Sequence, residues 1–194
     1  MKRIDCLRIL AELRKDQLVV CCLGVTASEW MLVSPGEHTY SMKSAMGLVG
    51  PLGLGLSLAL PGKSVWAFDG DGALAMNLGT LLTFASIQPP NFIYFVMANR
   101  CYESAGGQPI VNSDKTNFEI MARGAGIENA YTFTSLDDFR ESIDGIIDRG
   151  AFSVVILEVE THSEKLPAAP DQPIEMTYRF GRYIERETGR KVFR

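Results

Sequence analysis

Apolar residues in this chain gather in short continuous runs, and stretches with helical periodicity separate these runs. Residues 18–23, 64–68 and 92–98 are almost entirely apolar, which predicts strands that are buried on both faces. In the intervening stretches apolar residues recur every three or four positions, a pattern typical of helices with one buried side. The predicted elements are helices over 4–15, 46–60, 74–87, 116–125, 135–149 and 175–187 and strands over 18–23, 64–68, 92–98, 131–133 and 151–159.

The order of these elements predicts the fold class. Strands that alternate with helices favour an α/β protein with a doubly wound parallel sheet and helices on both faces. We expect a single domain over residues 1–194, in which residues 166–194 form a Pro-rich connector and a last helix. Residues 101–115 lack periodicity and contain two glycines and a proline. They are expected to form a long loop over the functional site.

Composition and charge narrow the class of protein. Hydrophobic residues make up 46% of the 194 residues and charged residues 22%, as expected for a globular domain with an ordinary core. The net charge of −4 argues against a nucleic-acid surface, and no apolar run reaches membrane-spanning length. The charged start lacks a signal-peptide core, so we expect a cytoplasmic protein. The four cysteines form no C-x-x-C pair and are expected to be reduced thiols.

Two oxygen-bearing side chains follow neighbouring predicted strands. Gly70-Asp71-Gly72 comes just after the strand at 64–68, and Asn99 follows the strand at 92–98. If these strands are parallel neighbours, both side chains point into the crevice where open α/β sheets bind ligands. Mg2+ takes oxygen ligands from carboxylates, amides and phosphates, and glycine lets the backbone approach a phosphate closely. The segment therefore predicts a magnesium-diphosphate site, whereas Asp-Gly alone would indicate a tight turn with a solvated carboxylate.

The spacing of these residues resembles the Gly-Asp-Gly…Asn signature of thiamine-diphosphate enzymes. From Lys2 to about Arg186 the chain is similar to the smaller, cofactor-binding subunit of sulfopyruvate decarboxylase and to the C-terminal part of phosphonopyruvate decarboxylase. Residues 70–81 and 99–108 carry the resemblance, and Ser44-Ala45-Met46-Gly47 resembles an element that contacts the cofactor ring. The resemblance implies the thiamine-diphosphate-binding fold, with thiamine diphosphate and Mg2+ as cofactors.

The resemblance also implies roles for individual residues. Asp71, Asn99 and the backbone carbonyl of Cys101 would ligate Mg2+, and Met46 would be the apolar wedge that bends the cofactor. The residues expected at the cofactor are Gly24, Thr26, Ser28, Ser44, Met46, Gly70, Asp71, Gly72, Ala73, Asn99, Cys101, Tyr102, Glu103 and Ser104.

By the same resemblance, the chain is the cofactor-binding subunit of a decarboxylase that acts on a small 2-oxo acid. The glutamate that activates the cofactor belongs to a pyrimidine-binding domain in this family, and one α/β unit accounts for residues 1–194. We therefore expect a separate pyrimidine-domain chain to complete the active site, in a hetero-oligomer that also self-associates. Neither nucleic acid nor a membrane is expected as a partner.

Alternative functions stay open at this point. An acyl transferase would use the same cofactor, and a non-catalytic binding module would keep the same fold. The subunit of a 2-oxo acid oxidoreductase would usually carry iron–sulfur cysteines, and their spacing is missing here. Glu29 and Glu103 depart from the family pattern and would weaken binding of an anionic substrate. Arg100 would either offset them as an anion partner or lie on the surface.

Overall fold

A six-stranded parallel sheet forms the centre of the molecule. The computed structural model describes residues 1–161 and 172–193. The strands of the sheet lie in the order β2-β1-β3-β4-β8-β7, and all neighbouring pairs are parallel. In chain order they are β1 (Leu18–Cys21), β2 (Thr39–Ser41), β3 (Val65–Gly70), β4 (Phe92–Ala98), β7 (Ala130–Phe133) and β8 (Ser153–Glu158). The predicted α/β class with a doubly wound parallel sheet is confirmed.

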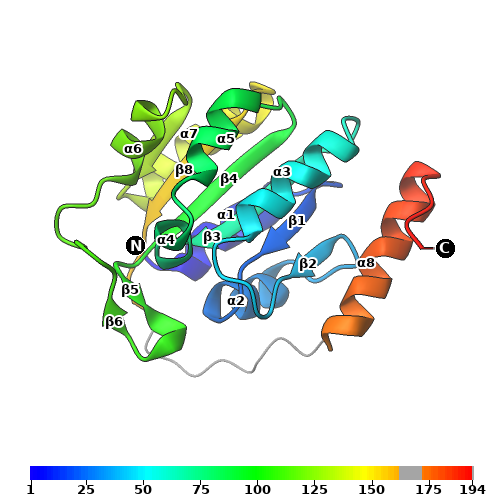
Figure 1. Cartoon of the computed structure of the whole chain (residues 1–194), viewed down its shortest axis with the longest axis horizontal. Helices are drawn as coiled ribbons and strands as arrows, with labels where there is room; N and C mark the ends of the chain where they lie inside the picture. Colours follow the sequence, from blue (N-terminus) through cyan, green and yellow to red (C-terminus); the bar gives the residue numbers. More distant parts are fainter. Residues whose placement is uncertain (162–171, 194) are drawn as a thin grey trace.

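Helices cover both faces of this sheet (Figure 1). The helices are α1 (Arg3–Leu13), α2 (Val25–Val33), α3 (Val49–Ala59), α4 (Asp71–Met76), α5 (Thr80–Ile87), α6 (Phe118–Gly124), α7 (Leu136–Asp148) and α8 (Pro173–Thr188). Buried side chains of α1, α2 and α7 form one hydrophobic cluster with one face of the sheet. Those of α3, α4, α5, α6 and α8 form a second cluster on the opposite face. This two-sided burial explains why β4 is apolar at every position.

The glycines of α3 allow this helix to lie close to the sheet. A Cβ at Gly53 would stand 2.8 Å from the ring of Phe92 and 3.0 Å from the Cβ of Ala67. A Cβ at Gly50 would stand 2.8 Å from the ring of Phe84. The Gly-rich pattern of the predicted helix over 46–60 therefore reflects close packing of helix against strand.

Three local features differ from the sequence-based expectation. The short strand β2 was missed, because its three residues carry too little hydrophobic pattern to predict a strand. The single helix expected over 74–87 is divided into α4 and α5, since the chain turns between Asn77 and Gly79. Part of the loop expected over 101–115 is ordered as a two-stranded antiparallel ribbon of β5 (Cys101–Tyr102) and β6 (Gln108–Pro109), joined by the short helix η1 (Glu103–Ala105).

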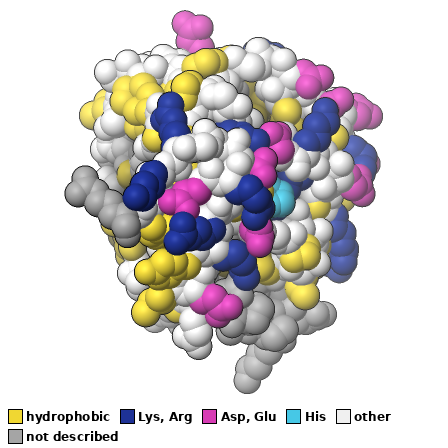
Figure 2. All heavy atoms as spheres, turned by 90° about the vertical axis from the view of Figure 1, so that its right-hand side faces the viewer, with side chains coloured by type: hydrophobic (Ala, Val, Ile, Leu, Met, Phe, Trp, Pro, Cys, Tyr) yellow, Lys and Arg dark blue, Asp and Glu magenta, His cyan; other side chains and the backbone are white. Residues whose placement is uncertain are grey.

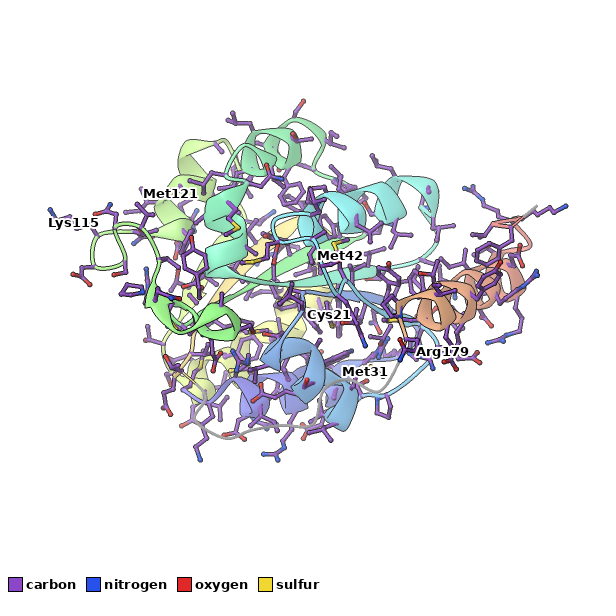
Figure 3. All side chains as sticks on the ribbon, turned by 60° about the horizontal axis from the view of Figure 1, so that its bottom comes forward. Cys21, Met31, Met42, Lys115, Met121 and Arg179 are labelled. Atoms are coloured by element: carbon purple, nitrogen blue, oxygen red, sulfur yellow. The ribbon has the colours of Figure 1, made fainter. Side chains whose placement is uncertain are left out.

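Helix α8 packs beside the edge strand β2 and lies at the opposite side of the molecule from the β5–β6 ribbon (Figure 1). Charges of both signs intermingle on this side of the surface (Figure 2). Among them Arg186 pairs with Glu37 at 2.7 Å, and Lys63 pairs with Asp16 at 2.9 Å. Figure 3 shows Arg179 on α8 and Lys115 on the loop at the far end. Residues 166–171 of the connector predicted over 166–173 lie outside the described residues.

Within residues 1–161 and 172–193, none of the helices combines the length and the apolar character that crossing a membrane would require.

Candidate functional site

An open cleft lies at the carboxyl ends of β1, β3 and β4. The chain passes from β1 to the edge strand β2 and then returns to β3 on the other side of β1. The strand order therefore reverses between β1 and β3, which is the point where doubly wound sheets bind ligands. The cleft is lined by Arg3, Cys22, Leu23, Val25, Thr26, Met46, Gly70, Asp71, Gly72, Ala73, Met97, Asn99, Cys101, Tyr102, Glu103, Ser104 and Ala105.

Asp71 begins α4 directly after β3, and its carboxylate is almost fully buried in the wall of the cleft. One carboxylate oxygen accepts the amide of Gly72 at 2.8 Å, and the other accepts the amide of Arg100 at 2.7 Å. Burial raises the pKa of Asp71 to about 6, although both amides favour the charged form. Each oxygen keeps a further lone pair for a ligand, so this carboxylate is suited to a cation.

A second buried carboxylate, Asp69, stands behind the cleft. Its oxygens accept the hydroxyl of Tyr94 at 2.8 Å and the amide of Gly70 at 3.0 Å. Burial raises the pKa of Asp69 to about 6. Asp69 does not line the cleft, so its bonds hold the end of β3 against β4.

Asn99 follows β4 and lines the same cleft as Asp71. Its side-chain oxygen accepts the amide of Cys101 at 3.2 Å, and its side-chain nitrogen donates to Glu103 at 3.0 Å. Arg100 has a φ of +64°, an unusual backbone angle for a residue other than glycine. Because its amide donates to Asp71, this turn joins the tip of β4 to the tip of β3.

The guanidinium of Arg100 points away from the cleft. It pairs with Glu158 at the end of β8 and donates to the carbonyl of Thr116 at 2.6 Å. Its Cζ lies 5.9 Å from the ring centre of Phe118. Arg100 therefore anchors the loop to β8 and α6, and of the two roles considered for it the structure favours the one outside the cleft.

The β5–η1 segment packs across two glycines of the strand tips. A Cβ at Gly72 would stand 2.6 Å from the ring of Tyr102, and one at Gly24 would overlap the hydroxyl of Ser104. Gly24 also has a φ of +82°, which favours glycine. These two contacts place the segment against both the Gly-Asp-Gly turn and the turn that precedes α2.

A buried ion cluster joins α1, α2 and η1 beside the cleft. Nε of Arg3 donates to Glu29 at 2.8 Å, and Nη1 of Arg3 donates to Glu103 at 2.9 Å. The side chains of Arg3 and Glu29 are 4% and 1% exposed, and that of Glu103 is 13% exposed. Desolvation lowers the pKa of Arg3, but its bonds and charges from the two glutamates outweigh this and raise it. The two acids that depart from the family pattern are thus held by one cation.

The cleft brings together most of the residues that the sequence predicted at the cofactor. The predicted residues that line it are Thr26, Met46, Gly70, Asp71, Gly72, Ala73, Asn99, Cys101, Tyr102, Glu103 and Ser104. Three others do not line it: Gly24 contacts Ser104, Ser28 lies within α2, and Ser44 is exposed.

Arg3 is the charged residue of the cleft that sequence reasoning missed. Leu7 and Leu10 lie one and two turns further along α1 and are fully buried, so Arg3 shares their inward face. A charged residue on the buried face of an amphipathic helix was the available signal. The apolar lining residues Cys22, Leu23, Val25, Met97 and Ala105 were also missed, because strand ends and small loop residues carry no such signal.

The oxygen groups of the cleft suit Mg2+ rather than a metal that needs several protein ligands. In residues 1–161 and 172–193, no three or more His, Cys, Asp or Glu side chains are grouped to hold a metal ion. Mg2+ is commonly held by one or two protein oxygens together with substrate phosphates and water. Asp71 and Asn99 are two oxygen-bearing side chains at the tips of adjacent strands, whose register aligns Gly70 with Met97.

Comparison with known proteins finds relatives over nearly the whole chain. The family model described as thiamine pyrophosphate enzyme, C-terminal TPP binding domain, matches residues 20–157. Sulfopyruvate decarboxylase subunit beta of Methanocaldococcus jannaschii is 31% identical over 186 residues, which cover 95% of this chain and 98% of that protein. Phosphonopyruvate decarboxylase of Streptomyces viridochromogenes is 30% identical over 178 residues, which cover 91% of this chain and 44% of that protein.

A solved structure shares the fold at low sequence identity. The thiamine diphosphate-dependent 4-hydroxybenzoylformate decarboxylase of Rhodococcus jostii superposes with a TM-score of 0.72 and 16% identity. The superposition covers 84% of this chain and 33% of that one, so this chain spans about a third of its length. At this identity the likeness concerns the fold alone.

Proposed function

This chain belongs to the thiamine pyrophosphate enzymes, and we propose that it is the thiamine-diphosphate- and Mg2+-binding subunit of a 2-oxo acid decarboxylase. The observation that carries the proposal is the position of Asp71 and Asn99 in one cleft, at the carboxyl ends of adjacent strands. Its named relatives include sulfopyruvate and phosphonopyruvate decarboxylases. A 2-oxo acid with a sulfonate or phosphonate group is therefore the proposed class of substrate.

The buried carboxylate supports a bound cation. Burial raises the pKa of Asp71, which means that its negative charge lacks compensation within the protein. A divalent ion would remove this penalty, with Asp71 and Asn99 as side-chain ligands and the carbonyl of Cys101 as a third. The ion would in turn hold the diphosphate of the cofactor.

Thiamine diphosphate, when bound, supplies the electron sink for the decarboxylation of a 2-oxo acid. This chain would bind and orient it. Gly72 leaves room for the ring of Tyr102, which packs against the Gly-Asp-Gly turn. Tyr102 and Ser104 hold the η1 segment over the strand tips and would limit access of water from that side. Met46 lines the cleft from the segment before α3 and offers an apolar surface to the cofactor rings.

The mouth of the cleft supports a second chain as a partner. Four apolar side chains near it are exposed by 37–58%, namely Met46, Leu48, Met76 and Leu78. The segments that carry them are joined, because the side-chain amide of Asn77 donates to the carbonyl of Gly47 at 2.8 Å. Exposed apolar groups gathered at a site mark interaction surfaces. The Methanocaldococcus relative is named as a subunit, and we propose that a pyrimidine-domain chain covers this rim and supplies the activating glutamate.

The charge pairing beside the cleft reduces the repulsion that an anionic substrate would meet there. Glu29 and Glu103 would repel a sulfonate or phosphonate if both were unpaired. Arg3 donates to both, so the cluster carries a net charge of −1 rather than −2. A cation at Asp71 would offset this charge further.

Metal-dependent cofactor binding tests the proposed site. Asp71→Ala removes the charged metal ligand and should abolish Mg2+-dependent binding of thiamine diphosphate measured by calorimetry. Asp144→Ala, on the exposed side of α7, is the matched control and should bind like the wild type. Unchanged affinity in Asp71→Ala would overturn the assignment of the metal site.

An activity assay tests the division of the active site between chains. The purified chain, supplied with sulfopyruvate or phosphonopyruvate, thiamine diphosphate and Mg2+, should release no CO2. Addition of a pyrimidine-domain chain should restore release. Appreciable turnover by the purified chain would show that the site is complete without a partner.

A further inference from the structure

Glu103 accepts two hydrogen bonds at the site, and the family signature assigns it no role. Its Oε2 accepts the side-chain nitrogen of Asn99 at 3.0 Å and Nη1 of Arg3 at 2.9 Å. One oxygen thus links the end of β4 to the first turn of α1. Among these three residues, Asn99 is the proposed metal ligand. Glu103 and Arg3 would influence the cation through Asn99 and would not bind it directly.

The chemistry of the Asn99–Glu103 bond fixes which way the amide faces. A carboxylate only accepts hydrogen bonds, so the group that Asn99 turns toward Glu103 has to be its NH2. The side-chain oxygen then faces the opposite way and accepts the amide of Cys101 at 3.2 Å, with a second lone pair remaining. If the amide were turned over, it would present two hydrogen-bond donors to the cation in place of an oxygen.

Arg3 fixes Glu103 in turn. Its Nε is bound to Glu29 in the core, and its side chain is only 4% exposed. A buried cation held by two carboxylates has little freedom to move, because breaking either bond leaves a buried charge without its partner. Glu103 is therefore held from α1, 100 residues away along the chain.

We propose that Glu103, held by Arg3, is a positioning residue that orients the side-chain oxygen of Asn99 toward the metal. The inference rests on the proposed function, because Asn99 must be a metal ligand for its orientation to matter. Groups that orient metal ligands typically change metal affinity by roughly 10- to 100-fold when they are removed.

The test measures binding of Mn2+ in the presence of thiamine diphosphate, by the electron paramagnetic resonance signal of free Mn2+, on the full chain. Glu103→Ala should raise the Kd for Mn2+ by at least about tenfold. Glu103→Gln keeps a carbonyl oxygen for the Asn99 amide and should stay within about threefold of the wild type. Equal losses in the two variants would mean that the charge of Glu103 matters and its orienting bond does not, and would overturn the proposal.

A double-mutant cycle separates orientation from general attraction of a cation. Asn99→Asp removes the NH2 group that Glu103 holds while keeping an oxygen ligand. In that background Glu103→Ala should no longer weaken Mn2+ binding, and relief of repulsion between two carboxylates should strengthen it. A further tenfold loss in the Asn99→Asp background would contradict the proposal. Thermal unfolding of each variant without metal checks that the chain is folded.

A charge control comes from Glu160, which follows β8 and has a side chain that is 67% exposed. Glu160→Gln removes a negative charge from the same end of the sheet and should change the Kd by less than about threefold, whereas a loss equal to that of Glu103→Ala would favour a purely electrostatic role.

The inference and the proposed function fail in different ways. No binding by the wild type, or full binding by Asp71→Ala, would refute the function. Loss in Asp71→Ala with wild-type binding in Glu103→Ala would refute the inference alone.

Discussion

Replacing Asp71 with asparagine removes a buried negative charge while keeping the size of the side chain. Burial raises the pKa of this carboxyl from 3.8 to about 6 in the folded chain. This rise in pKa corresponds to a difference of about 3 kcal/mol between the protonated and the charged form. The folded state holds the proton more tightly than the unfolded state. The protonated carboxyl of Asp71 therefore stabilises the fold fully below pH 4, and this contribution is lost as the pH rises through 6.

The hydrogen bonds of Asp71 set the opposing cost. Its two oxygens accept the amides of Gly72 and Arg100, and asparagine has one oxygen for both. A buried amide without its acceptor costs about 1–3 kcal/mol at any pH. We therefore expect the metal-free variant to be less stable than the wild type at pH 4 and about equal or more stable at pH 7.

Urea unfolding of both proteins, in buffer that contains a chelator, measures this difference between pH 4 and pH 7.5. Measured relative to the wild type, the free energy of unfolding of Asp71→Asn should rise by about 3 kcal/mol from pH 4 to pH 7.5. Other titrating groups, including Asp69 and His38, are present in both proteins, so their contributions cancel in the difference. A difference that does not change with pH would refute the reasoning that Asp71 is buried with an uncompensated charge.

Further substitutions test the packing around the site. Gly53→Ala should lower the free energy of unfolding by about 1–3 kcal/mol, since its Cβ would meet a phenyl ring at 2.8 Å. A Cβ at Gly55 in the same helix would meet nothing within 4 Å, so Gly55→Ala should raise the free energy of unfolding by about 0.5–1 kcal/mol. Tyr94→Phe removes the hydroxyl that donates to Asp69. In urea unfolding it should lower the free energy of unfolding by about 1–3 kcal/mol at pH 7 and by less below pH 5. Gly72→Ala places a Cβ 2.6 Å from the tyrosine ring of β5 and should make the ribbon a faster target for limited proteolysis. An unchanged digestion rate would count against that contact.

The sequence predicted those parts of the fold that depend on local pattern. The run over 92–98 matches β4 residue for residue, because a strand buried on both faces leaves an unbroken apolar signal. The sequence left Thr116 or Asn117 as the cap of α6 and predicted Ser135 as the cap of α7. In the structure Asn117 and Ser135 each accept an amide of the first helical turn. The meeting of Asp71 and Asn99 in one cleft follows from parallel pairing of adjacent strands, and this geometry was predictable from two motifs.

Contacts between distant segments could not be predicted in the same way. The bond from Arg3 to Glu103 spans 100 residues, and neither residue belongs to a motif that indicates the other. The turn between α4 and α5 contains Asn77, whose side chain donates to the carbonyl of Gly47 in another segment. The apolar periodicity within 74–87 does not depend on Gly47, so the pattern predicts one continuous helix.

The charges around the cleft bear on how an anionic cofactor would enter it. Among the described residues that line the cleft, the charged ones are Arg3, Asp71 and Glu103, and Arg3 is already shared with the buried Glu29. Arg3 and the three carboxylates of Glu29, Asp71 and Glu103 together carry a charge of −2. A divalent cation at Asp71 would bring that sum to zero and would offer the diphosphate a direct ligand. In this chain the metal would thus supply the attraction that basic side chains supply in other phosphate sites, which is why loss of Asp71 should abolish cofactor binding and not merely weaken it.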